Sequence, residues 1–173
     1  MIILFLLLYL PFQTVVMKVV LLVVGKSEDA RWNNALADYQ ERLRHYLPFE
    51  MVTLPDIKRT GKMTDSQQKE LEGQRICKFI QPDDWCVLLD ERGQEFTSVQ
   101  FAAYIEKKLH LTAKRLIFIV GGSFGFSDAV YAKATERIAL SKMTFSHQMV
   151  RPIFVEQLYR AMTILRGEAY HHS

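Results

Sequence analysis

The strongest constraint on the fold is a short apolar run that breaks abruptly into glycines. Residues 116–120 are leucine, isoleucine, phenylalanine and valine, and Gly121, Gly122 and Gly125 follow them. Such a run is typical of a strand buried on both faces. The glycines allow positive φ and a close approach of the backbone to a ligand, and Ser127 can cap a following helix. This order indicates a ligand site at the carboxyl end of a strand, although a tight turn that binds nothing would show the same pattern.

Strand and helix patterns alternate along the chain, which predicts an α/β fold with a mainly parallel sheet flanked by helices. We expect strands at residues 19–24, 49–54, 85–89, 116–120 and 138–141. Helices are expected at residues 27–47, 64–80, 97–109 and 129–132, and around 153–165. Thr64 and Thr97 each stand three residues before a glutamine, which is the spacing of a capping box. The 173 residues contain no repeat and no linker, so we expect a single domain.

Residues 1–16 are almost wholly apolar and differ from the rest of the chain. They lack the positive start and the small-residue cleavage site of a signal peptide. The unbroken apolar run before Pro11 is shorter than the ~20 residues that span a bilayer. A self-sufficient strand begins at Met17 and Lys18. We therefore expect translation to start naturally at Met17 and the domain to comprise residues 17–173, with a membrane anchor as the minor alternative.

The composition is that of an ordinary globular protein, with 49% hydrophobic and 24% charged residues. The net charge of +3 permits a nucleic-acid partner without requiring one. Cys77 and Cys86 lie beside apolar residues and have no His or Cys partner at metal-ligand spacing. We expect buried thiols rather than a disulfide or a zinc site, no metal, and a cytoplasmic location.

The glycine loop also matches the pattern of a serine hydrolase. Gly121-Gly122-Ser123-Phe124-Gly125 satisfies the G-x-S-x-G nucleophile elbow, and Asp128 and His147 follow in the order of a catalytic triad. Asp128 is too close to Ser123 for a triad in that fold, and the chain is small, so a hydrolase is a minor alternative. The glycines do not follow G-x-G-x-x-G, and the chain has no Gly-Lys-Ser/Thr run.

Several stretches together resemble one family, the small SPOUT methyltransferases that modify ribosomal RNA of the large subunit. The matching stretches are residues 119–125, 140–148, 156–161 and 167–171, and the opening at 17–25 and the turn at 89–93 also fit. The resemblance implies an α/β domain with a C-terminal trefoil knot, which composition alone would not predict. It further implies a homodimer that uses S-adenosylmethionine to methylate N3 of a pseudouridine in helix 69 of 23S ribosomal RNA on the assembled ribosome. A module of the same fold that binds RNA or the ribosome without catalysis is the main alternative.

The resemblance also assigns residues to the site. The cofactor is expected to contact the strand end at Leu89, the glycine loop and the loop after residue 139, that is Leu89, Gly121, Gly122, Leu140, Ser141, Lys142, Met143, Thr144 and Phe145. The reacting nitrogen carries a proton that must leave, and a base is expected among His147, Tyr170 and His171. The RNA is expected to contact Arg151, Arg160 and His172.

Some of these residues have simpler interpretations. His147 could cap a helix, and the last residues could form a frayed tail that in this family would instead complete the site of the partner subunit. Arg151 and Arg160 could pair with Glu156 or lie in the dimer interface. The sequence departs from the family at Ser146, Pro152 and His172. Pro152 is harmless in the first turn of a helix but would kink it one turn further in.

Overall fold

The computed structural model describes residues 17–27, 29–59 and 61–170, and within them five parallel strands form one sheet. The strand order is β2-β1-β4-β3-β5. The strands are β1 (Lys18–Val24), β2 (Phe49–Leu54), β3 (Asp84–Glu95), β4 (Arg115–Val120) and β5 (Glu136–Ala139). Because every pairing is parallel, the carboxyl ends of all strands lie at one edge of the sheet, where open α/β proteins bind ligands. The predicted parallel α/β fold is confirmed.

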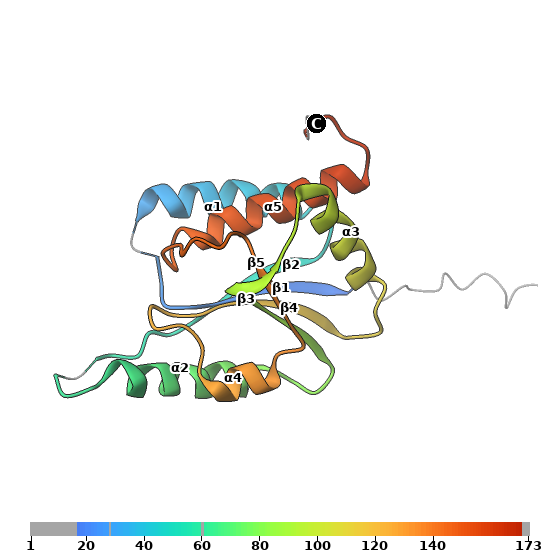
Figure 1. The fold of residues 1–173 in the computed structure, drawn as a ribbon. Coiled ribbons are helices and arrows are strands. Elements are labelled where there is room, and N and C mark those ends of the chain that lie inside the picture. The colour runs from blue at the N-terminus through green and yellow to red at the C-terminus, as the bar shows by residue number, and fades with distance from the viewer. Residues whose placement is uncertain (1–16, 28, 60, 171–173) are drawn as a thin grey trace, which may run out of the picture.

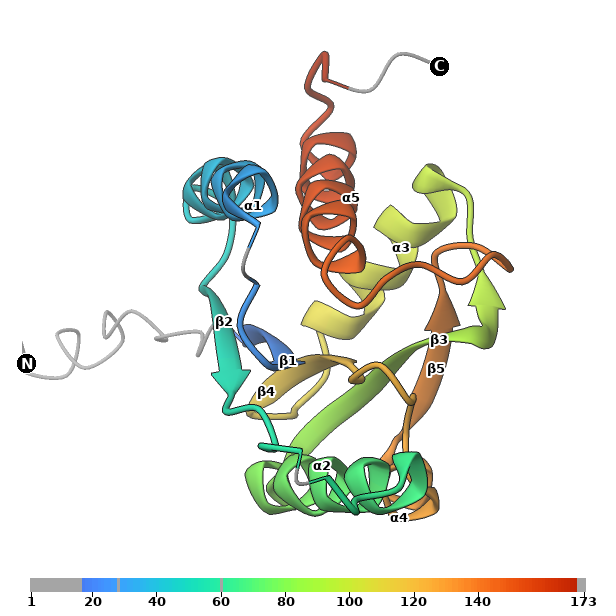
Figure 2. The ribbon, with the colours of Figure 1, turned by 90° about the vertical axis from the view of Figure 1, so that its left-hand side faces the viewer.

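Helices cover both faces of the sheet, as Figures 1 and 2 show. One face carries α1 (Ala30–Leu43), α3 (Ser98–Leu109) and α5 (Val150–Leu165), and α5 packs against both α1 and α3. The other face carries α2 (Asp65–Phe79) and α4 (Asp128–Lys133), which pack against each other. The sheet therefore separates two apolar cores.

Strand β1 contributes to both cores. Val19, Leu21 and Val23 pack into the cluster under α1, α3 and α5, whereas Val20 and Leu22 point into the cluster over α2 and α4. None of these side chains is more than 1% exposed. Full burial of an aliphatic side chain contributes about 1.5–3 kcal/mol, which explains why β1 is a continuous apolar run.

The helix ends follow the capping signals of the sequence in most places. Thr64 and Thr97 both form the capping boxes expected of them, with Gln67 and Gln100. The expected helix over residues 27–47 was too long, because Asp29 rather than Ser27 caps it and the chain leaves the α-helix after Leu43. Ser127 occupies the cap position of α4, but its side chain makes no capping hydrogen bond. Pro152 lies in the first turn of α5, so it does not kink that helix.

Strand β3 is longer than expected and is irregular. It was expected to end at Leu89, but it continues to Glu95 with a register shift between Leu89 and Gln94 in its pairing with β5. A Cβ atom added to Gly93 would lie 2.5 Å from the carbonyl carbon of Ile138, so only glycine lets β5 pass this point. The fifth strand begins at Glu136, two residues before the expected start at Ile138.

Cys86 is fully buried, and burial raises the pKa of its thiol to about 11, which makes it unreactive at neutral pH. Cys77 is half-buried, and the two cysteines are not bonded to each other. No helix in the described ranges is both long and apolar enough to cross a membrane. The predicted extension over residues 1–16 lies outside the described residues.

Candidate active site

A cavity of about 690 Å³ opens at the carboxyl end of β4 and beside the second half of β3. Its walls come from residues 89–92 of β3, residues 120–126 after β4, and the loop and turn at residues 140–147 before α5. Binding sites for small molecules commonly enclose ~300–1,000 Å³. Segments that are far apart in the sequence therefore meet around one space large enough for a cofactor.

Most of the expected cofactor residues line this cavity. They come from all three walls and are Leu89, Gly121, Gly122, Leu140, Ser141, Met143, Thr144 and Phe145. Lys142 is the exception, because its side chain is 83% exposed and its Nζ lies 3.7 Å from Glu95 outside the cavity. The Lys142 side chain therefore does not line the cavity, and a contact between this residue and the cofactor stays a prediction.

The glycine loop has a different physical basis from the one expected. Only Gly125 has a positive φ, of 74°, and Gly121 and Gly122 do not. A Cβ atom on Gly122 would lie 2.2 Å from Glu72 Oε2, and one on Gly121 would lie 3.2 Å from the Phe126 ring. Gly122 is needed because α2 brings the Glu72 carboxylate against the loop, and a hydrogen bond of 3.1 Å from Gly125 N to Gly122 O closes the turn.

The third wall is held by side-chain hydrogen bonds. Thr144 Oγ1 donates to Glu91 Oε2 at 2.6 Å, which joins the loop before α5 to β3. Ser141 Oγ accepts from Met143 N at 3.0 Å, and Ser146 Oγ accepts from Met149 N at 3.2 Å. These bonds hold the loop in place beside β3 and before α5.

His147 lines the cavity between the glycine loop and the start of α5. Its Nδ1 lies 3.4 Å from Ser123 Oγ. Burial lowers the pKa of His147, the Arg151 charge lowers it further, and Asp56 and Glu72 partly oppose these effects. The neutral ring, which can accept a proton, is therefore favoured at neutral pH. The helix-capping interpretation is wrong, because α5 begins after Met149 without any side-chain cap.

Arg151 lies inside the protein rather than on an RNA-facing surface. Its side chain is 1% exposed. The guanidinium donates to the backbone oxygens of Val24 at 2.7 Å, Gly25 at 2.9 Å and His147 at 3.0 Å. The prediction that Arg151 contacts RNA is contradicted in this conformation, because all its contacts tie α5 and the His147 turn to the end of β1.

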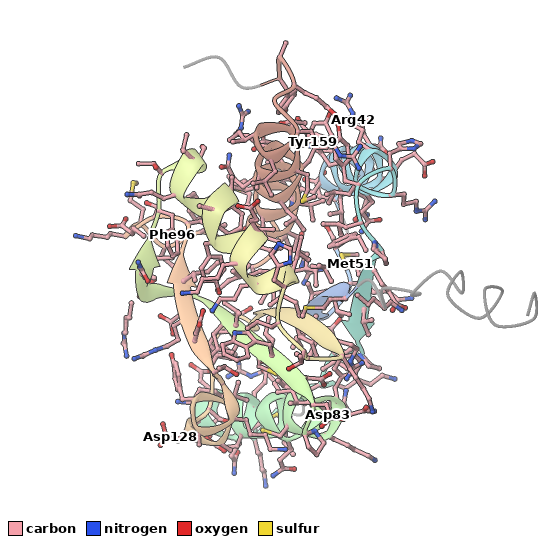
Figure 3. All side chains as sticks on the ribbon, turned by 90° about the vertical axis from the view of Figure 1, so that its right-hand side faces the viewer. Arg42, Met51, Asp83, Phe96, Asp128 and Tyr159 are labelled. Carbon is pink, nitrogen blue, oxygen red and sulfur yellow. The ribbon has the colours of Figure 1, made fainter. Side chains whose placement is uncertain are left out.

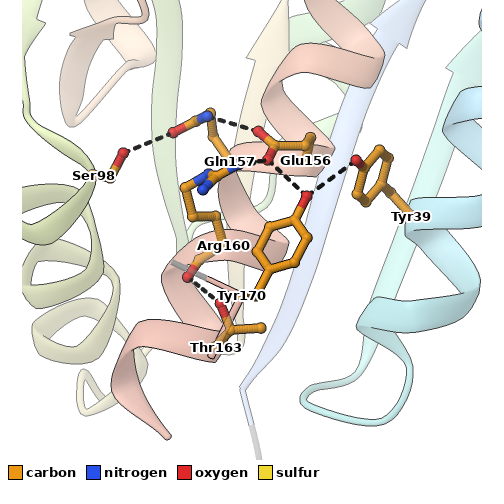
Figure 4. A network of polar contacts seen from close by, with 7 residues as sticks. All are labelled: Tyr39, Ser98, Glu156, Gln157, Arg160, Thr163 and Tyr170. Atoms are coloured by element: carbon orange, nitrogen blue, oxygen red, sulfur yellow. Dashed lines mark hydrogen bonds and ion pairs between the residues drawn. The ribbon is translucent and has the colours of Figure 1, made fainter. Parts of the chain in front are cut away.

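Tyr170 lies beside α1 and α5, away from the cavity. Figure 4 shows its hydroxyl between Tyr39 and Glu156, at 3.1 Å from each. Arg160 donates to Glu156 Oε1 at 2.5 Å and lies 4.7 Å from the centre of the Tyr170 ring. Figure 3 places Tyr159 and Arg42 in the same region, where α1 meets α5. The structure thus separates Tyr170 and Arg160 from His147, and His171 and His172 lie outside the described residues.

Sequence reasoning missed the polar residues on the β3 side of the cavity. Asp90, Glu91 and Arg92 line it, and Tyr131 of α4 donates a hydrogen bond to Asp90. Their position directly after a buried apolar run could have indicated that they belong to the site, but we expected a turn at these residues. In the part of the chain that the structure describes, no group of His, Cys, Asp and Glu side chains could hold a metal ion.

Two relatives support the resemblance seen in the sequence. A protein from Parabacteroides distasonis named Ribosomal RNA large subunit methyltransferase H is 58% identical over 156 residues, which are 90% of this chain and 99% of that protein. A protein of the same name from Bacteroides fragilis is 54% identical over the same shares. A solved structure, that of a probable methylase family protein from Haemophilus influenzae Rd KW20, has 13% identity and a TM-score of 0.45, and the match covers 87% of this chain and 67% of that one.

The family itself is shown by a sequence profile described as "Predicted SPOUT methyltransferase". This profile matches residues 17–171, which is most of the chain. The matched range includes all three walls of the cavity and the turn that carries His147. The chain belongs to the SPOUT methyltransferase family.

Proposed function

We propose that this protein methylates N3 of a pseudouridine in helix 69 of 23S ribosomal RNA, on the assembled ribosome in the cytoplasm, with S-adenosylmethionine as the methyl donor. Its family and the name of its relatives support methyl transfer to large-subunit ribosomal RNA. The particular nucleotide is the one that the resemblance implies. The observation that carries the proposal is that the three expected segments line one cavity of about 690 Å³.

The residues of the cavity fit an adenosyl cofactor. Leu89, Leu140 and Phe145 supply apolar walls for a flat purine, and the glycine loop leaves backbone groups open to its polar edges. Met143 also lines the cavity, and it is 75% exposed although a large apolar side chain is usually covered. Its side chain is therefore open to contact with a bound cofactor. When bound, S-adenosylmethionine would supply a methyl group on a positively charged sulfur.

His147 is the group best suited to take the proton from N3. Its lowered pKa keeps the ring neutral, and the Ser123 hydroxyl and the Arg151 contact to its backbone oxygen restrain it. A positioned base contributes about 10²–10⁴-fold to a proton transfer.

The position of Tyr170 is consistent with the homodimer that the resemblance implies. The hydroxyl of Tyr170 bonds to Glu156, whereas Val150 is the residue of α5 that lines the cavity. At 1.5 Å per residue these positions are about 9 Å apart along the helix. We therefore propose a homodimer in which Tyr170 and His171 complete the site of the partner subunit, and in which Arg160 and His172 contact RNA. A trefoil knot would hold the three walls in fixed relation.

Two other functions make different predictions. A module that binds RNA without catalysis would show no affinity for S-adenosylmethionine in isothermal titration calorimetry. A serine hydrolase would need a carboxylate on His147, and within the described ranges none accepts a hydrogen bond from that ring. The contact of Ser123 with His147 alone does not make a triad.

Nucleoside mass spectrometry of ribosomal RNA tests the proposal. A strain that lacks the gene should lose N3-methylpseudouridine from 23S ribosomal RNA. The wild-type gene should restore it, both as the full chain and as a chain that begins at Met17. A mark that persists in the deletion strain contradicts the substrate assignment, and failure of the shorter chain contradicts the expected start at Met17.

A further inference from the structure

A buried carboxylate lies behind the cofactor wall and is not used in the mechanism above. Glu72 of α2 is 4% exposed. Its Oε1 accepts a hydrogen bond from Gln68 Nε2 at 2.8 Å, whereas its Oε2 is buried and has no hydrogen-bond partner. Among the described residues Glu72 forms no ion pair. A buried charged group without a full set of partners costs stability, so its presence calls for a compensating role.

The position of this oxygen relates it to the cavity. Oε2 lies 2.2 Å from the point where a Cβ atom of Gly122 would be, so it contacts the bare backbone of a residue that lines the cavity. The carboxylate therefore packs against the glycine loop, which forms this part of the cavity wall. The Glu72 carboxylate also acts on His147, on another part of the cavity wall, where it partly opposes the lowering of the pKa of the ring.

The other acidic groups of the cavity differ from Glu72. Glu91 and Asp128 are exposed, and Asp90 and Glu91 accept hydrogen bonds from Tyr131 and Thr144. Water and salt weaken the field of exposed charges, whereas a charge in the interior is screened much less. Glu72 is therefore the buried acid of this region, and water and salt would screen a charge on it least.

We propose that the Glu72 carboxylate is a buried counter-charge for the positively charged sulfur of S-adenosylmethionine. This inference rests on the proposed function and adds a charge selectivity to it. The carboxylate does not touch the cofactor, and it acts through the glycine loop. Because the product S-adenosylhomocysteine has a neutral sulfur, the same charge favours exchange of spent cofactor for fresh cofactor.

The test compares two ligands that differ in this charge. Isothermal titration calorimetry on the full chain would measure the Kd values of S-adenosylmethionine and S-adenosylhomocysteine for the wild type and for Glu72→Gln. The variant should bind S-adenosylmethionine about tenfold more weakly, a change of ~1.4 kcal/mol, and S-adenosylhomocysteine within about twofold of wild type. Equal weakening of both ligands indicates a structural role and overturns the proposal, as does no change in either.

Glu70→Gln is the matched control, because Glu70 is exposed on the same helix. It should leave both Kd values within about twofold of wild type. Should Glu72→Gln fail to fold, the wild type alone decides: its preference for S-adenosylmethionine should persist from low to high salt, because a buried charge is poorly screened. A preference that disappears with salt, or that is absent, overturns the proposal. Binding of neither ligand by the wild type would instead refute the cofactor assignment.

Discussion

Replacement of Arg151 by methionine tests whether the start of α5 is held by its buried guanidinium. In the wild type this group donates to three backbone oxygens, those of Val24, Gly25 and His147. A hydrogen bond that involves a charged group contributes about 1.5–3 kcal/mol, so the three together amount to ~4.5–9 kcal/mol. Methionine also removes the cost of burying the charge, which is several kcal/mol. The expected net loss in free energy of unfolding is about 2–5 kcal/mol.

The assay is thermal and urea unfolding followed by circular dichroism. For a domain of this size each kcal/mol corresponds to ~2–4 °C in Tm, so the Tm of Arg151→Met should fall by roughly 4–20 °C. Arg44→Met is the control, because Arg44 pairs with Glu41 at 2.7 Å while both side chains are mostly exposed. Exposed pairs contribute about 0–1 kcal/mol. Equal stability losses for Arg151→Met and Arg44→Met would refute the reasoning.

Three further predictions concern the cavity. His147→Gln should slow methyl transfer at least ~100-fold in single-turnover kinetics and change the Kd of S-adenosylmethionine little in calorimetry. An equal loss of rate and of cofactor affinity would indicate a structural role. The folded state lowers the pKa of His147, so the wild-type rate should stay level at neutral pH and fall only below about pH 6.5. The free energy of unfolding should fall in the same range, because the ring becomes protonated there. A midpoint above pH 7 in the pH–rate profile would contradict a lowered pKa. Gly122→Ala should lower Tm through its clash with Glu72, and adding Glu72→Ala should restore most of the loss. Gly125→Ala should cost ~1–2 kcal/mol from its positive φ alone, and adding Glu72→Ala to it should restore nothing.

The sequence was most informative where a local rule decides the structure. The apolar runs of β1 and β4 were placed within one residue of their observed starts, because a continuous apolar run is typical of a strand buried on both faces. Thr64 and Thr97 marked their helices because a capping box involves residues only three positions apart. The three walls of the cavity came from a resemblance to a family, since no local rule brings Leu89, Gly122 and Met143 together.

The residues that sequence reasoning misplaced depend on contacts between distant segments. Arg151 is buried because the end of β1, more than a hundred positions away, presents two free carbonyl oxygens to it. A side chain at Gly122 would clash with Glu72 of α2, and Gly93 lets β5 run alongside β3 past Leu89. No periodicity or motif in a single sequence encodes these partners.

Neither face of strand β1 should tolerate a polar substitution in its buried part. Val19, Leu21 and Val23 belong to the layer of α1, α3 and α5, and Val20, Leu22 and Val24 belong to the layer of α2 and α4. A polar substitution at Leu21 or Leu22 would therefore damage a different half of the protein in each case, yet both would weaken the same hydrogen-bonded strand. The two halves share β1, so neither should unfold while the other stays folded. In hydrogen exchange, amide protons on both sides of the sheet should therefore exchange through a single cooperative opening.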